Sequence, residues 1–255
     1  MEIFYSLWLG VIGAILGSFL ACMGYRIPNK IKTTYPSSFC SNCKKSLKWY
    51  MNIPILSYIL LRGKCYYCKK KIGFIYFFCE ILCAFLFVLS YQLFGFSLEF
   101  CISIILSCAL IVTIVSDFLY YYISDRVLIF SLIGVIISML FFLEPMDVVI
   151  KVVSGVILFL VMIGIKILGN SMFDKESMGD GDIKLMGVIG TSIGLLNSFI
   201  SLFFSSVIAL IFSIITIKKN KEGVIPFGPF LLVGALLVLF LNDIISPYIT
   251  ELFSL

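Results

Sequence analysis

The chain has 255 residues, of which 61% are hydrophobic and only 13% are charged, with a formal net charge of +5. Soluble domains carry about 25% charged residues, and a chain this apolar cannot cover itself with polar surface, so lipid must be its solvent. The sequence has no histidine, which excludes a Ser-His-Asp triad, a Cys-His pair and a three-histidine zinc site. Any proton transfer therefore uses Asp, Glu, Lys, Tyr or Cys. Lysines scattered at loop edges give no reason to expect nucleic-acid binding.

Apolar runs that suit bilayer crossings follow one another along the chain, since each crossing needs about 20 mainly apolar residues. The first run, at 3–25, carries Gly13 and Gly17 four residues apart, which is a small-xxx-small face for close helix packing. The run at 183–217 would be about 52 Å long as one helix, so we expect a break near 194–197. The expected spans are 3–25, 72–94, 99–116, 127–143, 148–168, the two halves of 183–217, and 226–246. We predict an all-α polytopic membrane protein with about eight transmembrane helices and one cytoplasmic zinc-binding loop.

The orientation follows from the basic residues, which collect on the cytoplasmic side of membrane proteins. The polar segment 26–71 holds 11 of the 19 Lys and Arg residues. If this segment is cytoplasmic and there are eight crossings, every other basic residue except Lys151 also falls at the cytoplasmic side. This uneven distribution of basic residues supports both the number of crossings and the orientation, which places both termini outside.

Two CxxC pairs, Cys40 with Cys43 and Cys65 with Cys68, are separated by 21 residues in the polar segment. Four thiolates at this spacing are typical of a tetrahedral zinc site. The alternative is a redox or disulfide role, which a cytosolic location disfavours. Four cysteine ligands leave no open position, so we expect a structural Zn²⁺ ion.

Most of the acidic residues fall in expected loops, but five lie within or at the edge of apolar spans, where a carboxylate is costly and often functional. These five are Glu80, Asp117, Asp125, Asp180 and Asp182. By the crossing count, Asp117 and Asp182 both lie at the cytoplasmic membrane face. Two carboxylates meeting there can share a proton, so that one activates water while the other protonates the scissile carbonyl. The alternative is that they are interfacial charges that only cap helices.

Several motifs resemble those of the type IV prepilin peptidases, which are membrane aspartyl proteases of the GxGD class. The segment 179–185 (GDGDIKL) resembles their GxGDxKL motif, and Asp117 with Asp125 resembles their first aspartate block. Segments 17–20 (GSFL), 52–58 (NIPILSY) and 226–230 (PFGPF) are similar to other family motifs in the same order. The sequence departs from the family at 21–24 (ACMG), where asparagine is common.

The resemblance implies a bifunctional enzyme of the bacterial cytoplasmic (inner) membrane whose active site faces the cytoplasm. It implies that Asp117 and Asp182 form the catalytic pair, and we expect Asp182 as the base because a helix N-terminus favours its ionised form. Gly179, Gly181, Asp125 and Asp180 are expected substrate-binding residues. The implied substrates are prepilin-like membrane proteins, whose basic leader is cleaved.

The resemblance also implies that the new N-terminus is methylated with S-adenosylmethionine. Residues 1–98, with the cysteine loop, are the expected methyltransferase-associated region, and 99–255 are the expected six-span peptidase region. Arg26 and Glu80 are weak candidates for the methylation site.

Two readings from other classes remain open at this point. Membrane carboxylates and a glycine-interrupted helix also suit a proton-coupled transporter, although the chain shows no paired halves. A zinc-bearing assembly scaffold would need no acidic pair. Cleavage of a prepilin-like peptide by the purified protein separates the enzyme from both alternatives.

Overall fold

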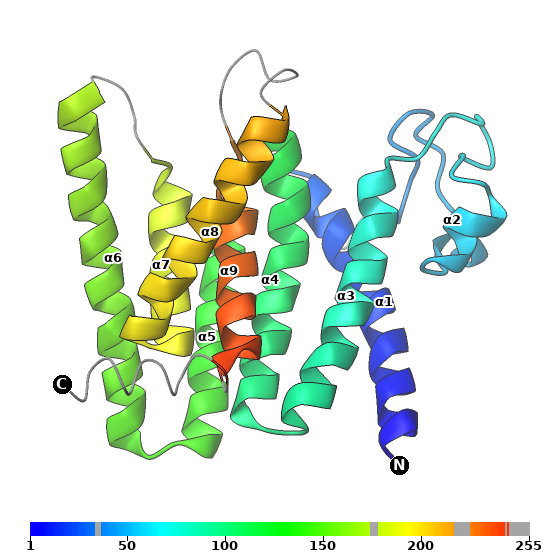
Figure 1. The fold of residues 1–255 in the computed structure, drawn as a ribbon. Coiled ribbons are helices and arrows are strands. Elements are labelled where there is room, and N and C mark those ends of the chain that lie inside the picture. The colour runs from blue at the N-terminus through cyan, green and yellow to red at the C-terminus, as the bar shows by residue number, and fades with distance from the viewer. Residues whose placement is uncertain (34–36, 174–177, 217–224, 243, 245–255) are drawn as a thin grey trace. The chain divides into compact units, whose positions relative to one another are not determined.

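The computed structural model describes residues 1–33, 37–173, 178–216, 225–242 and 244 of the chain (Figure 1). Within these residues there are nine α-helices, one short 3-10 helix (η1) and no β-strand. In chain order they are α1 (Glu2–Arg26), η1 (Trp49–Asn52), α2 (Leu56–Leu60), α3 (Phe74–Phe94), α4 (Leu98–Tyr120), α5 (Asp125–Phe142), α6 (Pro145–Phe173), α7 (Asp180–Ile193), α8 (Leu195–Thr216) and α9 (Gly228–Phe240). The prediction of an all-α fold is confirmed.

The expected membrane spans correspond one to one to α1 and α3 to α9. Six of these helices are long and apolar enough to cross a bilayer: α1, α3, α4, α5, α6 and α8. Helices α7 and α9 have 14 and 13 residues, which makes each about 20 Å long against a hydrocarbon core of about 30 Å. The polytopic membrane character is therefore confirmed, whereas the total of eight crossings stays a prediction.

The break expected near 194–197 is present. Helix α7 ends at Ile193 and α8 begins at Leu195, and the residue between them, Gly194, has a φ of +84°. A residue with a Cβ is strained at this φ, so glycine allows the chain to reverse within one residue.

Two expected loops are shorter in the structure than the sequence indicated. Helix α4 continues to Tyr120, so Asp117 lies within a helix and not at the start of a loop. Likewise α6 continues to Phe173 and α7 already begins at Asp180. A polar side chain at the end of an apolar run does not by itself end a helix, and α4 ends instead where Tyr121 takes a left-handed φ of +51°. Four of the lysines used in the orientation argument lie outside the described residues: Lys175, Lys218, Lys219 and Lys221.

The chain divides into two compact units, of which the first contains Met1–Gly95 and Ser107–Ser124. In this unit α1 packs against α3 through its glycines. A Cβ at Gly13 would lie 2.8 Å from Ala84 Cα, and a Cβ at Gly17 would lie 2.8 Å from Cys83 Cβ. Contacts this short leave no room for a side chain, so the predicted small-xxx-small packing face is confirmed.

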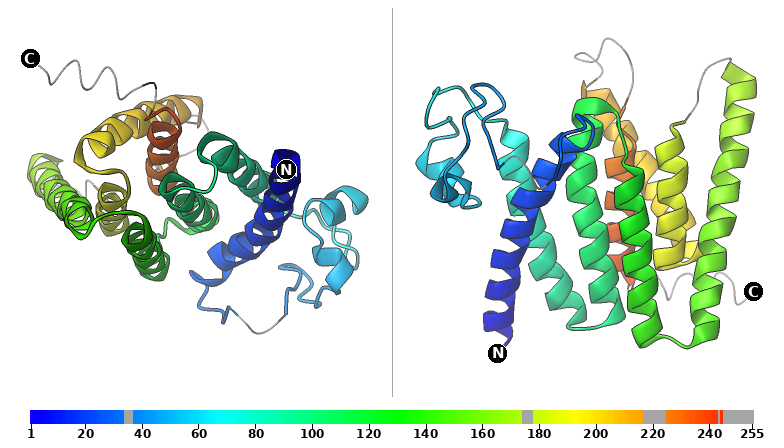
Figure 2. Two further views of the ribbon diagram at one scale, coloured as in Figure 1. Left: turned by 90° about the horizontal axis from the view of Figure 1, so that it is seen from below. Right: turned by 180° about the vertical axis from the view of Figure 1, so that it is seen from behind.

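The second unit contains Phe96–Leu106 and Asp125–Leu255. Helix α7 packs against α5, α6, α8 and α9, and in the end-on view of Figure 2 it lies among these four helices. Its residues from Ile183 onward are mostly buried. Helices α6 and α7 can approach each other closely because Gly155 and Gly190 have no side chain. A Cβ at Gly155 would lie 2.6 Å from the Gly187 carbonyl oxygen, and one at Gly190 would lie 2.6 Å from Leu158 Cδ1. The helix that carries the GDGD motif is therefore the central helix of the second unit.

Candidate active site and metal centre

The cysteine loop is built from two similar turns, one for each CxxC pair. In the first, the Cys40 N–H donates to the Lys45 carbonyl at 3.0 Å and the Lys44 N–H donates to the Cys40 carbonyl at 2.9 Å. In the second, 25 residues later, Cys65, Lys70 and Lys69 make the same two hydrogen bonds at 2.9 and 3.0 Å. Each turn is closed by an isolated antiparallel bridge, one at 39 and 46 and the other at 64 and 71. The chain thus presents the same paired-thiol turn twice.

The two turns bring the four sulfur atoms together. The Sγ atoms of Cys40, Cys43, Cys65 and Cys68 all lie within 4.8 Å of one another, and the Cys40 and Cys68 sulfurs are 3.9 Å apart. A tetrahedral Zn²⁺ ion with Zn–S bonds of 2.3 Å places its sulfur ligands about 3.8 Å apart. A disulfide needs about 2.05 Å. The arrangement fits a four-thiolate zinc ion, which would supply a fixed cross-link between the turns.

The surroundings of the sulfurs lower the pKa of Cys40 and Cys68, whereas desolvation and the neighbouring sulfurs raise the pKa of Cys43 to about 11. The pKa of Cys68 is lowered to about 6, because the backbone N–H of Lys70 and the side-chain amide of Asn42 donate to its sulfur. Two of the lysines beside the cysteines lie over aromatic rings. Lys44 lies 5.5 Å from the Phe39 ring centroid and Lys45 lies 5.3 Å from that of Tyr67. These cation–π contacts rigidify the turns that hold the ligands.

Two charged residues join the cysteine loop to the helices of the first unit. The buried Arg26, which ends α1, donates to the carbonyls of Lys32 at 3.1 Å and Thr33 at 3.0 Å. Glu80 on α3 accepts a 2.7 Å hydrogen bond from the backbone N–H of Ile55. Ile55 precedes α2 with a φ of +63°, which is strained for a β-branched residue. Arg26 and Glu80 therefore hold the backbone of the polar segment at two points.

Asp117 lies in the last turn of α4, in the first unit. Its exposed fraction is only 5%. The helix ends three residues later, where Tyr121 has a φ of +51° and its N–H still donates to the Asp117 carbonyl at 2.9 Å. A left-handed residue of this kind is a common helix end. The carboxyl group is thus held in a buried position near the C-terminus of a helix.

Asp182 lies in the first turn of α7, in the second unit. The N-cap residue of α7 is Gly179, which has extended backbone and no side chain to cap the helix. Asp182 is at the third helical position, from which a carboxylate can reach back to the N-cap. A Cβ at Gly179 would lie only 3.3 Å from Asp182 Oδ2. The glycine therefore leaves the space that this carboxylate uses.

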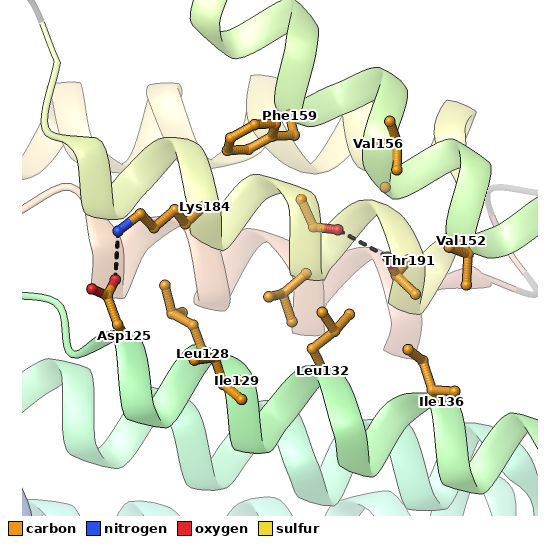
Figure 3. Close-up of a pocket in the computed structure, with 13 residues that line it drawn as sticks. Asp125, Leu128, Ile129, Leu132, Ile136, Val152, Val156, Phe159, Lys184 and Thr191 are labelled. Atoms are coloured by element: carbon orange, nitrogen blue, oxygen red, sulfur yellow. Dashed lines mark hydrogen bonds and ion pairs between the residues drawn. The ribbon is translucent and has the colours of Figure 1, made fainter.

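The charged residues on either side of Asp182 form ion pairs with the neighbouring helices. Lys184 Nζ lies 2.7 Å from Asp125 Oδ1 on α5, and Asp180 Oδ1 lies 2.6 Å from Lys166 Nζ on α6. Figure 3 shows Lys184 and Asp125 meeting across the gap between α7 and α5. Asp180 and Lys184 are four residues apart, so they share one face of α7, and Asp182 lies on the other face. The first turn of α7 is thus tied to both flanking helices.

The sequence matches two family models, the first over the cysteine loop and the second over the aspartate motifs. Residues 11–94 match the bacterial peptidase A24 N-terminal domain, and residues 104–214 match the type IV leader peptidase family. A prepilin leader peptidase/N-methyltransferase of Bacillus subtilis is 34% identical over 94% of this chain and 96% of its own length. Enzymes with the same name from Legionella pneumophila and Vibrio cholerae are each 30% identical over 96% and 94% of this chain, and over 95% and 98% of their own lengths. No match was found among solved structures.

The chain belongs to the type IV leader peptidase family. The first family model includes the four cysteines, and the second includes both Asp117 and the GDGD motif. Membership in a leader peptidase family leaves the transporter reading without support. The division at 98 and 99 into a methyltransferase-associated and a peptidase region stays a prediction, and the compact units share α4 between them.

Two features of this leader peptidase were not apparent from the sequence. The Lys184 ammonium pairs with Asp125, 59 residues earlier in the chain. Lys166 was counted only as a basic residue, yet it pairs with Asp180. The i, i+4 spacing of Asp180 and Lys184 with opposite charges was the one available signal. It would have indicated a pair within α7, not the two pairs to other helices that form.

The metal centre can be tested by removing one ligand. Cys65→Ser should lower the zinc content from one ion per chain to a small fraction, because a serine hydroxyl does not replace a thiolate at a tetrahedral site. The measurement is metal analysis of the purified protein by mass spectrometry. Cys101→Ser on α4 is the matched control and should keep the metal. A wild-type protein without stoichiometric zinc, or a Cys65→Ser protein that retains it, would contradict the assignment.

The space beside Gly179 can be tested in the same way. Gly179→Ala places a methyl group 3.3 Å from Asp182 Oδ2 and should displace this carboxylate by a few tenths of an ångström. Cleavage of a prepilin-like substrate should then fall about tenfold to a hundredfold, since small misplacements of reacting groups are costly. Gly164→Ala on α6 is the control, because no atom lies within 4 Å of the added Cβ. Equal initial rates for the two variants would show that Gly179 does not serve this purpose.

Proposed function

We propose that this chain removes the leader peptide of prepilin-like membrane proteins and then methylates the new N-terminus. The observation that carries the proposal is the 34% identity to a prepilin leader peptidase/N-methyltransferase across nearly the full length of both chains. Such coverage includes the cysteine loop as well as the aspartate motifs, so neither activity is left without its part of the chain.

The peptidase step uses Asp117 and Asp182 as a pair of carboxyl groups. Asp182, in its ionised form, takes a proton from a water molecule, which attacks the scissile carbonyl carbon, while Asp117 donates its proton to the carbonyl oxygen. Collapse of the tetrahedral intermediate breaks the C–N bond: the proton held by Asp182 goes to the leaving amine, and one hydroxyl of the intermediate returns a proton to Asp117. The absence of histidine from the chain supports this assignment, because no imidazole can take either role.

The local environments support the division of roles. Asp182 lies in the first turn of α7, where the positive end of the helix dipole favours a negative charge. Asp117 lies buried in the last turn of α4, where the dipole has the opposite sign and the neutral acid is favoured.

Four residues around this pair are proposed to bind substrate: Gly179, Gly181, Asp125 and Asp180. The glycines allow a substrate backbone to come close to α7. The Asp125 and Asp180 side chains remain 60% and 78% exposed in spite of their ion pairs. They are therefore accessible to the basic residues of a leader peptide.

Methylation is assigned to residues 1–98, with S-adenosylmethionine as the methyl donor. When bound, this donor would supply its methyl group to the new α-amine of the cleaved product, with its sulfur–methyl bond breaking, S-adenosylhomocysteine leaving and the amine proton passing to solvent. Arg26 and Glu80 are proposed to position the polar segment in this step, since both hold its backbone. The structural zinc ion keeps the cysteine loop folded.

The proposed location is the bacterial cytoplasmic membrane, with the active site facing the cytoplasm. Six apolar helices support the membrane location. The cytoplasmic orientation is supported by the basic segment 26–71. The leader of a substrate inserted in the same membrane would reach this face.

The function is tested with purified protein, a prepilin-like substrate and S-adenosylmethionine, analysed by mass spectrometry for a cut and for a methyl group. Asp117→Asn and Asp182→Asn should each lower cleavage by several orders of magnitude, because neither carboxyl works without the other. Asp125→Asn and Asp180→Asn alter proposed substrate contacts but not the catalytic pair, so they should keep substantial activity. All four should insert in the membrane and retain zinc. Near-normal cleavage by Asp182→Asn would refute the aspartyl protease mechanism, and cut product without a methyl group would refute the second activity.

A further inference from the structure

The polar segment between α1 and α3 carries a group of exposed apolar side chains at η1 and α2. Leu56, Ile59 and Leu60 of α2 are 58%, 56% and 80% exposed, and Trp49 of η1 is 80% exposed. Positions i, i+3 and i+4 lie on one side of a helix, so the three α2 residues share a face. Because η1 contacts α2, Trp49 belongs to the same small substructure. These four side chains are called the apolar face below.

The other side of α2 is attached to α3. Tyr58 lies about 200° around the helix from Leu56, and its ring stacks on that of Phe77 with the centroids 4.5 Å apart. Just before α2, the Ile55 N–H donates to Glu80 Oε2 at 2.7 Å. Figures 1 and 2 show α2 beside the first turns of α3 and not beyond its end. The apolar face is therefore on the side of α2 away from α3.

The two contacts with α3 set the depth of α2 relative to the bilayer. Helix α3 is long and apolar enough to cross a membrane from Phe74 to Phe94, and its 21 residues match a hydrocarbon core of about 30 Å. Phe77 and Glu80 lie three and six residues after Phe74, which is about 4.5 and 9 Å along the helix axis. A helix held at these two positions lies beside the lipid leaflet and not in water.

The backbone of this segment has the partners that contact with lipid requires. The Leu56 N–H donates to the Pro54 carbonyl at 2.6 Å across a γ-turn in which Ile55 has a φ of +63° and a ψ of −55°. The N–H of Ile55 itself is taken by Glu80. Three N–H groups that follow α2 donate to carbonyls of α2 at 2.9 to 3.0 Å, those of Leu61, Arg62 and Gly63. Backbone groups that face lipid must be paired within the protein, and these are.

The charge of the segment identifies its partner. Residues 26–71 include 11 Lys and Arg residues and no Asp or Glu. Lys48, Arg62 and Lys64 flank η1 and α2 in the chain and are exposed. Basic side chains around an apolar face with an aromatic residue are typical of surfaces that lie in the interface of an anionic leaflet. The same charge repels a basic leader peptide, so it favours lipid over substrate as the partner.

We propose that η1 and α2 are embedded in the lipid leaflet at the Phe74 end of α3. The apolar face contacts the acyl chains, and three basic residues bind the phosphate groups of anionic lipids: Lys48, Arg62 and Lys64. In the orientation proposed above, this is the cytoplasmic leaflet. The two CxxC turns precede and follow this segment, so the metal centre is kept next to the bilayer. Lipid contact of this kind is independent of the proposed catalytic activities.

The first experiment measures lipid contact at a native residue. The chain has two tryptophans, so Trp8→Phe leaves Trp49 as the only one. In vesicles of brominated phosphatidylcholine, the Trp49 fluorescence should fall about twofold relative to unbrominated vesicles, because an interfacial ring reaches the upper part of the acyl chains. Iodide in the water should quench it weakly. Quenching by iodide but not by bromine would show a water-exposed face, and quenching by neither would show a face covered by protein, such as a second copy. Either result would overturn the proposal.

A second position guards against a local effect of Trp49. Leu60→Trp, in a protein with Trp8→Phe and Trp49→Phe, places the probe on α2 itself at an 80% exposed site, where the larger side chain meets no packing constraint. It should also be quenched by bromine and protected from iodide. The opposite pattern at position 60 would overturn the embedding of α2 whatever Trp49 shows.

The third experiment tests the headgroups. Brominated phosphatidylglycerol should quench Trp49 about threefold more effectively than brominated phosphatidylcholine at the same mole fraction, because basic residues gather anionic lipids. Lys48→Gln, Arg62→Gln and Lys64→Gln together should remove most of this preference and leave the quenching by phosphatidylcholine. Trp8, in a Trp49→Phe protein, is the matched control: it lies at the opposite end of α1 from the basic segment and should show no preference. Equal quenching of Trp49 by the two lipids, or a preference that survives in full in the triple variant, would overturn the headgroup site.

Discussion

The close approach of α6 and α7 is the constraint on which the rest of the second unit depends. At Gly155 and Gly190 the two backbones come so near that a Cβ would meet backbone or side-chain atoms at about 2.6 Å. Because lipid provides no hydrophobic drive between apolar helices, such small-residue contact is what holds them together. It places the short α7 at the centre of the unit, in contact with four other helices. Its first turn, which carries the GDGD motif, is then fixed in place by ion pairs to α5 and α6.

The opposite faces of α7 have different tasks as a result. One face carries Asp180 and Lys184, which form the ion pairs, while Asp182 is on the other. The glycines at the N-terminus of α7 leave room for a substrate backbone to come close.

The first unit solves a different problem, which is to fold a polar segment of more than 40 residues with little core of its own. Metal ligation supplies folding free energy that so small a segment cannot obtain from burial. The two repeated turns hold four sulfurs at distances that suit Zn²⁺, and Arg26 and Glu80 attach the segment to α1 and α3. The strained backbone at Ile55 is tolerated because Glu80 accepts its N–H.

Local patterns in the sequence predicted the helices and the cluster of four cysteines well. Apolar run length was sufficient to place all the main helices, Gly194 marked the reversal between α7 and α8, and CxxC spacing located the four sulfurs. Contacts between distant segments were not predictable in this way. The Lys184–Asp125 pair joins residues 59 positions apart, and nothing local distinguishes Gly187, where an added Cβ would meet only ordinary contacts, from Gly190, which packs against α6. The end of α4 was also misjudged, because Asp117 lies inside the helix with its side chain buried.

The most direct measurement of the catalytic pair is thiol cross-linking between the two aspartate positions. The five cysteines outside the metal centre are first replaced: Cys22, Cys79, Cys83, Cys101 and Cys108. A protein with Asp117→Cys and Asp182→Cys should then be cross-linked within one chain by a short bifunctional thiol reagent. A protein with Asp117→Cys and Ile193→Cys should not, because residue 193 lies about 16 Å further along α7. Absence of the 117–182 cross-link, or equal cross-linking of both proteins, would contradict a shared site for the two carboxylates.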